Sequence, residues 1–372
     1  MFGNMSNKDA TSIKSKFHGG MHVNDKKKTA YPIYLYIYLF VVYLQTEAEI
    51  KMIMENWLRL LSINLGWIAD FNKIIARYLK YFQLLKYLRK GSSSVKSVRF
   101  SCDGSKFVAS INDDTVRIWD IASEKEIQTL KGQFFGIYKA QFSPDGKLVI
   151  SCSADRIIRL WNVNTGFEMK RFEGHFGYVR GVHFSPDGNS IVSASNDKTI
   201  RLWNVQSGEE IQMLEGHLDN VTDVKFSNNG EIIASASSDC TIGIWDVKSS
   251  KRVKELSGHL GEVIVVQFSP DDRTIISCSA DKTVRLWDVQ SGTNLQILDG
   301  HTDVVNDVQF SSDAQTVVSC SKDKSVRIWD TKSGQAKQTL CEHFRSVTGV
   351  DFSPDGNSII SCSLDGTILL WG

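Results

Sequence analysis

Serine, histidine and aspartate recur together at a fixed spacing in this sequence, and these three residues form the catalytic triad of serine hydrolases. One set, His175, Ser193 and Asp197, lies in the segment GHFGYVRGVHFSPDGNSIVSASNDKTIRLWN at residues 174–204. In a hydrolase the serine attacks the substrate, the histidine takes its proton and the aspartate orients the histidine. The complete set occurs five times, however, and a catalytic site is needed once. No nucleophile-elbow motif accompanies any copy. The pattern therefore favours a structural role, and we predict no enzyme activity.

The remaining reactive residues do not indicate a cofactor or a metal. No glycine-rich phosphate loop leads from a strand into a helix, and no paired carboxylates stand apart from the repeated segments. Seven cysteines without a Cys-x-x-Cys motif make a poor disulfide framework and favour a reducing compartment, the cytoplasm or the nucleus. Four of them occupy the same position, three residues before an aspartate: Cys152, Cys278, Cys320 and Cys362. One per repeat gives a ring and no zinc cluster, so we expect small packing residues.

The elements that carry these residues are set by a strict repeat. Tryptophan recurs every 42 residues without insertion or deletion, at Trp119, Trp161, Trp203, Trp245, Trp287, Trp329 and Trp371. The sequence therefore contains seven copies of one unit. A period of about 40–45 residues, with Gly-His early and Trp-Asp late, is typical of a β-propeller.

Each copy has the pattern of four short strands. In the third copy, apolar residues alternate over residues 179–184, and the turn Ser-Pro-Asp-Gly follows at 185–188. Further strands are predicted at 190–195, 199–203 and 210–214. One such sheet cannot bury both of its faces, but seven sheets stacked radially can. We predict an all-β, seven-bladed propeller.

From about residue 82 to 372 the chain resembles a WD40-repeat protein with seven blades. The resemblance implies that a buried chain of four side chains, running from Trp to Ser to His to Asp, locks each blade. The polarity suits this role, because the indole only donates, the hydroxyl and imidazole donate and accept, and the carboxylate only accepts. The complete tetrads are His175, Ser193, Asp197, Trp203; His217, Ser235, Asp239, Trp245; His259, Ser277, Asp281, Trp287; His301, Ser319, Asp323, Trp329; and His343, Ser361, Asp365, Trp371.

The first two copies depart from this pattern. The second copy has Gln133 in place of the histidine, and the first has Gly91 and Ala109 in place of the histidine and the serine. We expect blades 1 and 2 to be less rigid than the other five.

The seventh copy raises the question of how the ring closes. The sequence ends at Gly372, directly after Trp371, so this copy contains only three strands. The exposed edge of its sheet must be covered. Moving back by three periods places residues 209–217 on 83–91 and Leu214 on Leu88. We therefore predict that residues 83–88 form the outer strand of blade 7, and that the propeller spans residues 83–372.

The resemblance also implies where partners bind. In WD40 proteins they often contact the face around the central channel, through residues three and five positions after the histidine and the residue before the turn aspartate. The candidate protein-binding residues are Tyr138, Tyr178, Arg180, Asn220, Glu262, Ile264, Asn306, Lys322 and Leu364. Tyrosine and arginine are enriched at binding hot spots, although such residues are also ordinary exposed side chains.

Two functions are compatible with this pattern. The leading hypothesis is a non-catalytic scaffold that assembles other proteins or peptides on the propeller faces. The alternative is a substrate receptor of a cullin-type ubiquitin ligase, because the Trp-Asp-x-Lys endings at 245–248 and 329–332 fit that class of WD40 protein. Many unrelated WD40 repeats share such endings.

The N-terminal segment differs in composition from the repeats. Residues 1–46 form a polar tail that ends in the apolar run YPIYLYIYLFVVYL at 31–44, and residues 47–82 have the periodicity of a helical hairpin. Fourteen apolar residues are too few to span a bilayer comfortably, so membrane association of 31–44 is possible but not favoured. The hairpin either docks on the propeller or provides a dimerisation or partner-binding helix.

Charge separates the two parts of the chain. Before Gly91 there are 14 Lys and Arg against 6 Asp and Glu, and from Gly91 onward 29 against 36. Because nucleic-acid binding requires a basic surface, an acidic propeller makes nucleic acid an unlikely partner.

Overall fold

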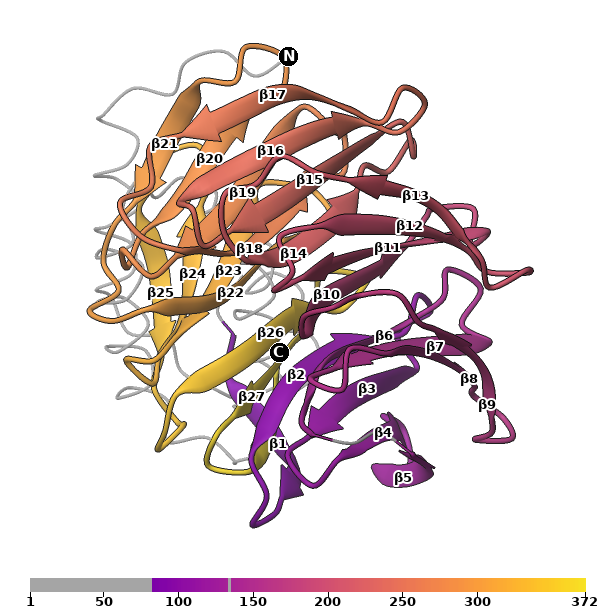
Figure 1. The fold of residues 1–372 in the computed structure, drawn as a ribbon. Helices are drawn as coiled ribbons and strands as arrows, with labels where there is room; N and C mark the ends of the chain where they lie inside the picture. Colours follow the sequence, from indigo (N-terminus) through magenta and orange to yellow (C-terminus); the bar gives the residue numbers. More distant parts are fainter. Residues whose placement is uncertain (1–81, 133–134) are drawn as a thin grey trace, which may run out of the picture. The chain divides into compact units, whose positions relative to one another are not determined.

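The computed structural model describes residues 82–132 and 135–372. The chain divides into two compact units, Met1–Lys73 and Ile74–Gly372, and the described residues all belong to the second. The polar tail, the apolar run at 31–44 and the helical hairpin, apart from its last residue Phe82, lie outside the described residues. Within the described part, all regular structure is β-strand, and 28 strands form seven four-stranded antiparallel sheets (Figure 1).

Each sheet is one blade, and the blades follow the chain in order. The inner strands are β2 (Val95–Phe100), β6 (Ile137–Phe142), β10 (Val179–Phe184), β14 (Val221–Phe226), β18 (Val263–Phe268), β22 (Val305–Phe310) and β26 (Val347–Phe352), in blades 1 to 7 respectively. The second strands are β3 (Lys106–Ile111), β7 (Leu148–Ser153), β11 (Ser190–Ser195), β15 (Ile232–Ser237), β19 (Thr274–Ser279), β23 (Thr316–Ser321) and β27 (Ile359–Ser363).

The third and outer strands complete each blade. The third strands are β4 (Thr115–Asp120), β8 (Ile158–Asn162), β12 (Ile200–Asn204), β16 (Thr241–Asp246), β20 (Val284–Asp288), β24 (Val326–Asp330) and β28 (Thr367–Trp371). The outer strands are β5 (Lys125–Lys131), β9 (Glu168–Phe172), β13 (Glu210–Leu214), β17 (Lys251–Ser257), β21 (Asn294–Leu298), β25 (Ala336–Leu340) and, in blade 7, β1 (Leu84–Lys90).

The inner strands contact one another from blade to blade and close a ring, because β26 of blade 7 packs on β2 of blade 1. The hydrophobic core lies between the blades, and each of its clusters combines residues of consecutive blades. Trp245 of blade 4, for example, packs with Leu202 and Leu214 of blade 3. No blade buries its faces alone, which is why a repeated sheet folds only as an array.

Two local features of the sequence fix each blade. In the turn after β10, the Ser185 hydroxyl donates to Asp187 at 2.5 Å and Gly188 adopts a φ of 73°, which favours glycine. At the start of each inner strand the pairing slips by one residue, as between Val179 and Gly181. Such a bulge bends the strand and increases its local twist.

The ring is closed by a segment from the N-terminal side. β1 pairs antiparallel with β28, from Leu84 opposite Trp371 to Lys90 opposite Thr367. Gln83 and Gly372 exchange two backbone hydrogen bonds of 3.0 Å. The strand therefore extends two residues beyond the predicted end at Leu88, because its partner β28 continues back to Thr367.

Phe82 extends this closure onto the neighbouring blade. Its ring lies 6.1 Å from that of Phe352 in blade 7, and its backbone exchanges hydrogen bonds with the Gln338 side chain of blade 6. Residues 82–90 thus connect blades 6 and 7 to the start of the first repeat.

Candidate functional site

The predicted tetrad residues are brought together in blades 3 to 6 at nearly identical distances. In blade 3 the Trp203 indole donates to Ser193 Oγ at 2.8 Å, Ser193 Oγ lies 2.7 Å from His175 Nε2, and His175 Nδ1 lies 2.7 Å from Asp197 Oδ2. With the proton of His175 on Nδ1, every group has a partner. The corresponding distances in blades 4, 5 and 6 are 2.7 or 2.8 Å.

Blade 7 differs at the end of its tetrad. Trp371 and His343 bond to Ser361 at 2.9 and 2.8 Å, but His343 Nδ1 bonds to Thr367 Oγ1 at 2.9 Å and lies 3.5 Å from Asp365. The carboxylate of Asp365 instead accepts from the backbone of Phe344 and from Thr367. The histidine position is therefore kept while its partner changes.

Blades 1 and 2 hold their tryptophans differently, as their sequences require. In blade 2, Trp161 donates to Ser151 Oγ at 2.8 Å, while Gln133 lies outside the described residues. In blade 1, Trp119 stacks on Phe107, with ring centroids 5.0 Å apart and planes 6° apart. An aromatic stack replaces the polar chain where Ala109 cannot bond.

The burial of the tetrads decides between catalysis and structure. The five tetrad serines are completely buried, and the five histidines are at most 6% exposed. A nucleophile must reach its substrate, so these hydroxyls cannot serve as one. The tetrads act instead as rigid supports for the loops that carry the histidine and the aspartate.

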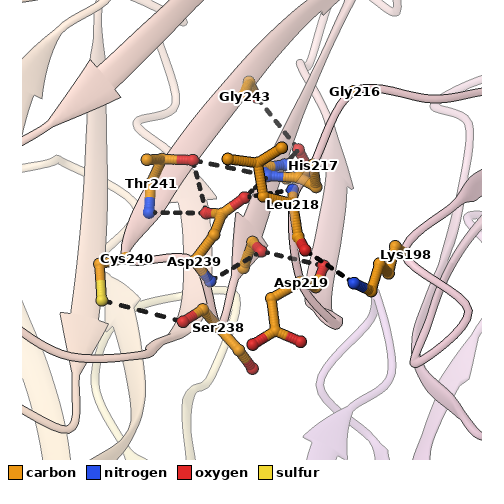
Figure 2. Close-up of polar contacts among 12 residues, drawn as sticks. Lys198, Gly216, His217, Leu218, Asp219, Ser238, Asp239, Cys240, Thr241 and Gly243 are labelled. Atoms are coloured by element: carbon orange, nitrogen blue, oxygen red, sulfur yellow. Dashed lines mark hydrogen bonds and ion pairs between the residues drawn. The ribbon is translucent and has the colours of Figure 1, made fainter.

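Blade 4 shows how a tetrad holds its loop (Figure 2). Asp239 Oδ2 accepts from both His217 and the backbone N–H of Leu218, at 2.8 and 2.9 Å, while Asp239 Oδ1 accepts from Thr241. The Lys198 ammonium of blade 3 donates to the Leu218 carbonyl at 2.8 Å. The backbone of the loop is fixed from both blades, and the Leu218 side chain is left exposed.

These loops form one face of the ring, which we call the loop face: it comprises residues 174–178, 216–220, 258–262, 300–304 and 342–346, with the turns that carry the tetrad aspartates. Backbone hydrogen bonds join each loop to the turn of its own blade, as from Asn196 to the Tyr178 carbonyl at 2.9 Å. Each inner strand leads from this face to the Ser-Pro-Asp-Gly type turns at its other end, which form the turn face.

Three of the predicted binding residues meet on the loop face although they come from blades 2, 3 and 5. The Arg180 guanidinium lies 5.1 Å from the centroid of the Tyr138 ring, and its Nη2 lies 3.8 Å from Glu262 Oε1. Glu262 also accepts from the Ser238 hydroxyl at 2.9 Å. The Arg180 guanidinium is therefore held between an aromatic ring and a carboxylate.

The other predicted residues on this face differ in how many contacts their side chains form. Asn306 is tied to blade 7 through Ser346 Oγ and the Val347 carbonyl. Ile264 packs against the core between blades 5 and 6. Tyr178 is exposed, and Leu364 is partly exposed. Within the described residues, the Asn220 and Lys322 side chains form no hydrogen bond or ion pair, so they remain available to a ligand.

An apolar rim on the loop face was not among the sites predicted from the sequence. Five large hydrophobic side chains are 77–88% exposed there: Phe135, Phe176, Leu218, Leu260 and Phe344. Four of them directly follow the tetrad histidine, and their backbone N–H groups bond to the tetrad aspartates. The signal was present in the repeat, because an apolar residue follows the histidine in four of the five complete copies.

The four repeated cysteines belong to the hydrophobic core between the blades. Cys152, Cys278, Cys320 and Cys362 are completely buried, and burial raises the pKa of Cys152 and Cys362 to about 12. This confirms their role as packing residues, and all seven cysteines are free. Residues 82–132 and 135–372 contain no cluster of three metal ligands, and no helix among them could cross a bilayer.

The tetrads make the fold sensitive to acid. Burial alone would raise the pKa of Asp239, but hydrogen bonds from Thr241, the Leu218 N–H and His217 outweigh it and lower the pKa to about 2. The other four tetrad aspartates also have lowered pKa values. A carboxyl with a pKa below its unfolded value of about 3.9 stabilises the fold above that pH and loses this contribution as the pH falls through its folded pKa.

Two histidines make a smaller contribution to the pH dependence of stability, at higher pH than the aspartates. Burial lowers the pKa of His217 and, further, of His183, so the unfolded chain takes up protons first below about pH 6.5. Asp351 opposes them, because burial raises its pKa to about 6. We expect the guanidinium midpoint of unfolding to change little from pH 7 to 5 and to fall steeply between pH 4 and 2. A midpoint independent of pH below 4 would contradict the tetrad geometry.

Comparison with known families agrees with this geometry. The family model described as WD40: WD domain, G-beta repeat, matches seven times, at residues 82–120, 124–162, 166–204, 208–246, 250–288, 292–330 and 334–372. The comparison with curated proteins gives no match. The first matched segment begins with the closing strand and the last ends at Trp371 and Gly372. The seven matches, together with the seven sheets and their recurring tetrads, show that this chain belongs to the WD40 family.

Proposed function

We propose that this protein is a non-catalytic scaffold that binds other proteins or peptides through its loop face. The observation that carries the proposal is the apolar rim together with the Tyr138, Arg180 and Glu262 cluster that it surrounds on the same face. Exposed apolar side chains on a rigid support are typical of protein-binding sites. WD40 propellers generally bind proteins or peptides, which supports the assignment.

Rigidity supports the same conclusion. Each rim residue on a complete tetrad has its backbone N–H bonded to a partly buried aspartate, so the side chain is presented without ordering a flexible loop. A binding site that is ordered in advance loses less conformational entropy on association. The free cysteines agree with action in a reducing compartment, the cytoplasm or nucleus.

A matched pair of double variants tests the loop face. Leu218→Ser with Leu260→Ser removes two rim side chains, whereas Val253→Ser with Leu295→Ser makes a similar change on exposed outer strands. Since all four residues are exposed, both variants should keep the wild-type melting temperature. We expect the rim variant to lower partner recovery in quantitative affinity purification by about tenfold or more, and the outer-strand variant to leave it unchanged.

Equal recovery with both variants would contradict the proposal. Replacing Tyr178 and Arg180 by alanine tests the centre of the face in the same assay. Proximity labelling in the native cell addresses the alternative, because a substrate receptor of a cullin-type ligase would label an adaptor and a cullin, and a plain scaffold would not.

A further inference from the structure

The turn face, at the opposite end of the ring from the loop face, contains a cavity. A cavity of about 310 Å³ opens among the turns of the turn face. The fifth residue of every inner strand lines it, including Gln141, His183, Lys225, Gln267, Gln309 and Asp351. Because all seven blades contribute, the cavity lies on the ring axis. Its volume is at the lower end of the range for small-molecule sites, roughly 300–1,000 Å³.

Most of the charges on the inner strands are paired. Arg99 binds both carboxylate oxygens of Asp307, at 2.8 and 3.1 Å, and Lys139 lies 2.7 Å from Asp223. Lys96, Lys225 and Asp351 remain, and of these three only Lys225 and Asp351 line the cavity. Within the described residues neither of these two belongs to an ion pair, and the Asp351 carboxylate accepts a hydrogen bond from the backbone N–H of Phe100, at 2.9 Å. An ammonium and a carboxylate thus line one cavity without an ion pair, although the positive charge of Arg99 in the same wall favours the charged form of Asp351.

The order of the blades explains why these two charges do not meet. Lys225 is on β14 and Asp351 on β26, and β18 and β22 lie between them on the shorter path around the ring. The fifth residues of these two strands are Gln267 and Gln309. Gln267 Oε1 and Gln309 Nε2 are buried and, within the described part of the chain, lack a hydrogen-bond partner. Gln309 as a whole is 4% exposed.

We propose that this cavity binds a small zwitterion of the amino-acid class, with its carboxylate at Lys225, its ammonium at Asp351 and its polar middle at the two glutamine amides. The walls offer one charge of each sign that belongs to no ion pair, which matches a ligand of no net charge better than a simple anion or cation. Buried polar atoms without partners require a ligand or water to satisfy them. The site faces away from the loop face and does not depend on the proposed function.

The titration behaviour of the two residues agrees with this geometry. Burial raises the pKa of Asp351 to about 6 and lowers the pKa of Lys225 to about 8. Both groups are still mainly charged at pH 7, so the unliganded protein carries the desolvation penalty of both charges. Protein groups that are destabilised in this way are more common at functional sites than elsewhere.

A series of unbranched amino acids measures the separation of the two charges. We would titrate the full-length chain at pH 7 with glycine, 4-aminobutanoate and 6-aminohexanoate by calorimetry, and with acetate and methylammonium at the same ionic strength. We expect at least one member of the series to bind and to raise the melting temperature, and the singly charged ions to bind at least about tenfold more weakly.

Variants link the binding to the two residues. Lys225→Gln and Asp351→Asn should each lower the affinity for the amino acid that binds by about tenfold or more. Lys147 is an exposed lysine on the turn face, and Lys147→Gln should not change this affinity. Both cavity variants remove an unpaired charge, so their unliganded melting temperatures should equal or exceed that of the wild type. The proposal is overturned if no member binds, if acetate binds equally well, or if neither cavity variant weakens binding.

Discussion

A chain that begins at Gly91 is expected to be insoluble or to melt about 10 °C or more below a chain that begins at Thr46. The shorter chain lacks β1, so the backbone edge of β28 has no partner. It also lacks Phe82, which packs on Phe352 in the core between blades 6 and 7. Folded proteins are stable by only about 5–15 kcal/mol, so the loss of a paired strand and of a packed aromatic ring should lower the melting temperature strongly. Thermal unfolding followed by circular dichroism measures the difference.

Two single substitutions test the same closure in the full-length chain. Leu84 packs against the core between blades 6 and 7, whereas the neighbouring Leu85 is exposed. Leu84→Asp should therefore lower the melting temperature clearly, and Leu85→Asp should change it little. Equal melting of the two truncated chains, or equal effects of the two substitutions, would show that β1 does not close the ring.

Asp281→Ala is expected to destabilise the protein by about 3 kcal/mol, because it removes the acceptor of four hydrogen bonds. Asp281 Oδ2 accepts from His259 and from the Leu260 N–H, and Oδ1 accepts from the N–H and hydroxyl of Thr283. The substitution leaves the buried His259 without its carboxylate and releases the loop that carries Leu260. Denaturant unfolding measures the loss.

Blade 1 provides the matched control for this substitution. Asp113 occupies the same position, but Gly91 stands where the histidine would be, and the partners of Asp113 are Thr115 and Arg117 on a partly exposed surface. Asp113→Ala should therefore destabilise the fold by about 1 kcal/mol or less. If both substitutions have the same effect, the histidine does not couple its loop to the blade.

The repeat predicts much of this structure because it fixes spacing. Seven tryptophans at one interval define seven blades, and the same interval places residues 83–91 on an outer strand. Leu88 packs against the core as Leu214 does, while Leu85 and Ile211 are both exposed, as the alignment implies. The tetrads follow from the same spacing, since His175, Ser193 and Asp197 meet only when the loop, the second strand and the turn of one blade are in register.

The ion pairs that cross the central channel could not be predicted in the same way. The ion pair of Arg99 with Asp307 joins residues 208 positions apart in sequence, and Lys139 with Asp223 joins blades 2 and 4. These ion pairs depend on which residues, at the third and fifth positions of the inner strands, face one another across the ring. They also depend on the bulge that bends each inner strand. A period of 42 residues shows which positions are equivalent, but it does not show which side chains of different blades pair across the channel. The stack of Phe107 on Trp119 likewise appears only where the tetrad is absent.

Hydrogen–deuterium exchange of the full-length chain, alone and with a partner recovered by affinity purification, tests the central claim most directly. We expect the partner to slow exchange at the loops 174–178, 216–220 and 258–262, where backbone and rim side chains form the loop face. Exchange in the turns of the turn face and in the outer strands should stay the same. Protection confined to the outer strands or the turn face, with the loops unchanged, would contradict the assignment of the loop face as the docking surface.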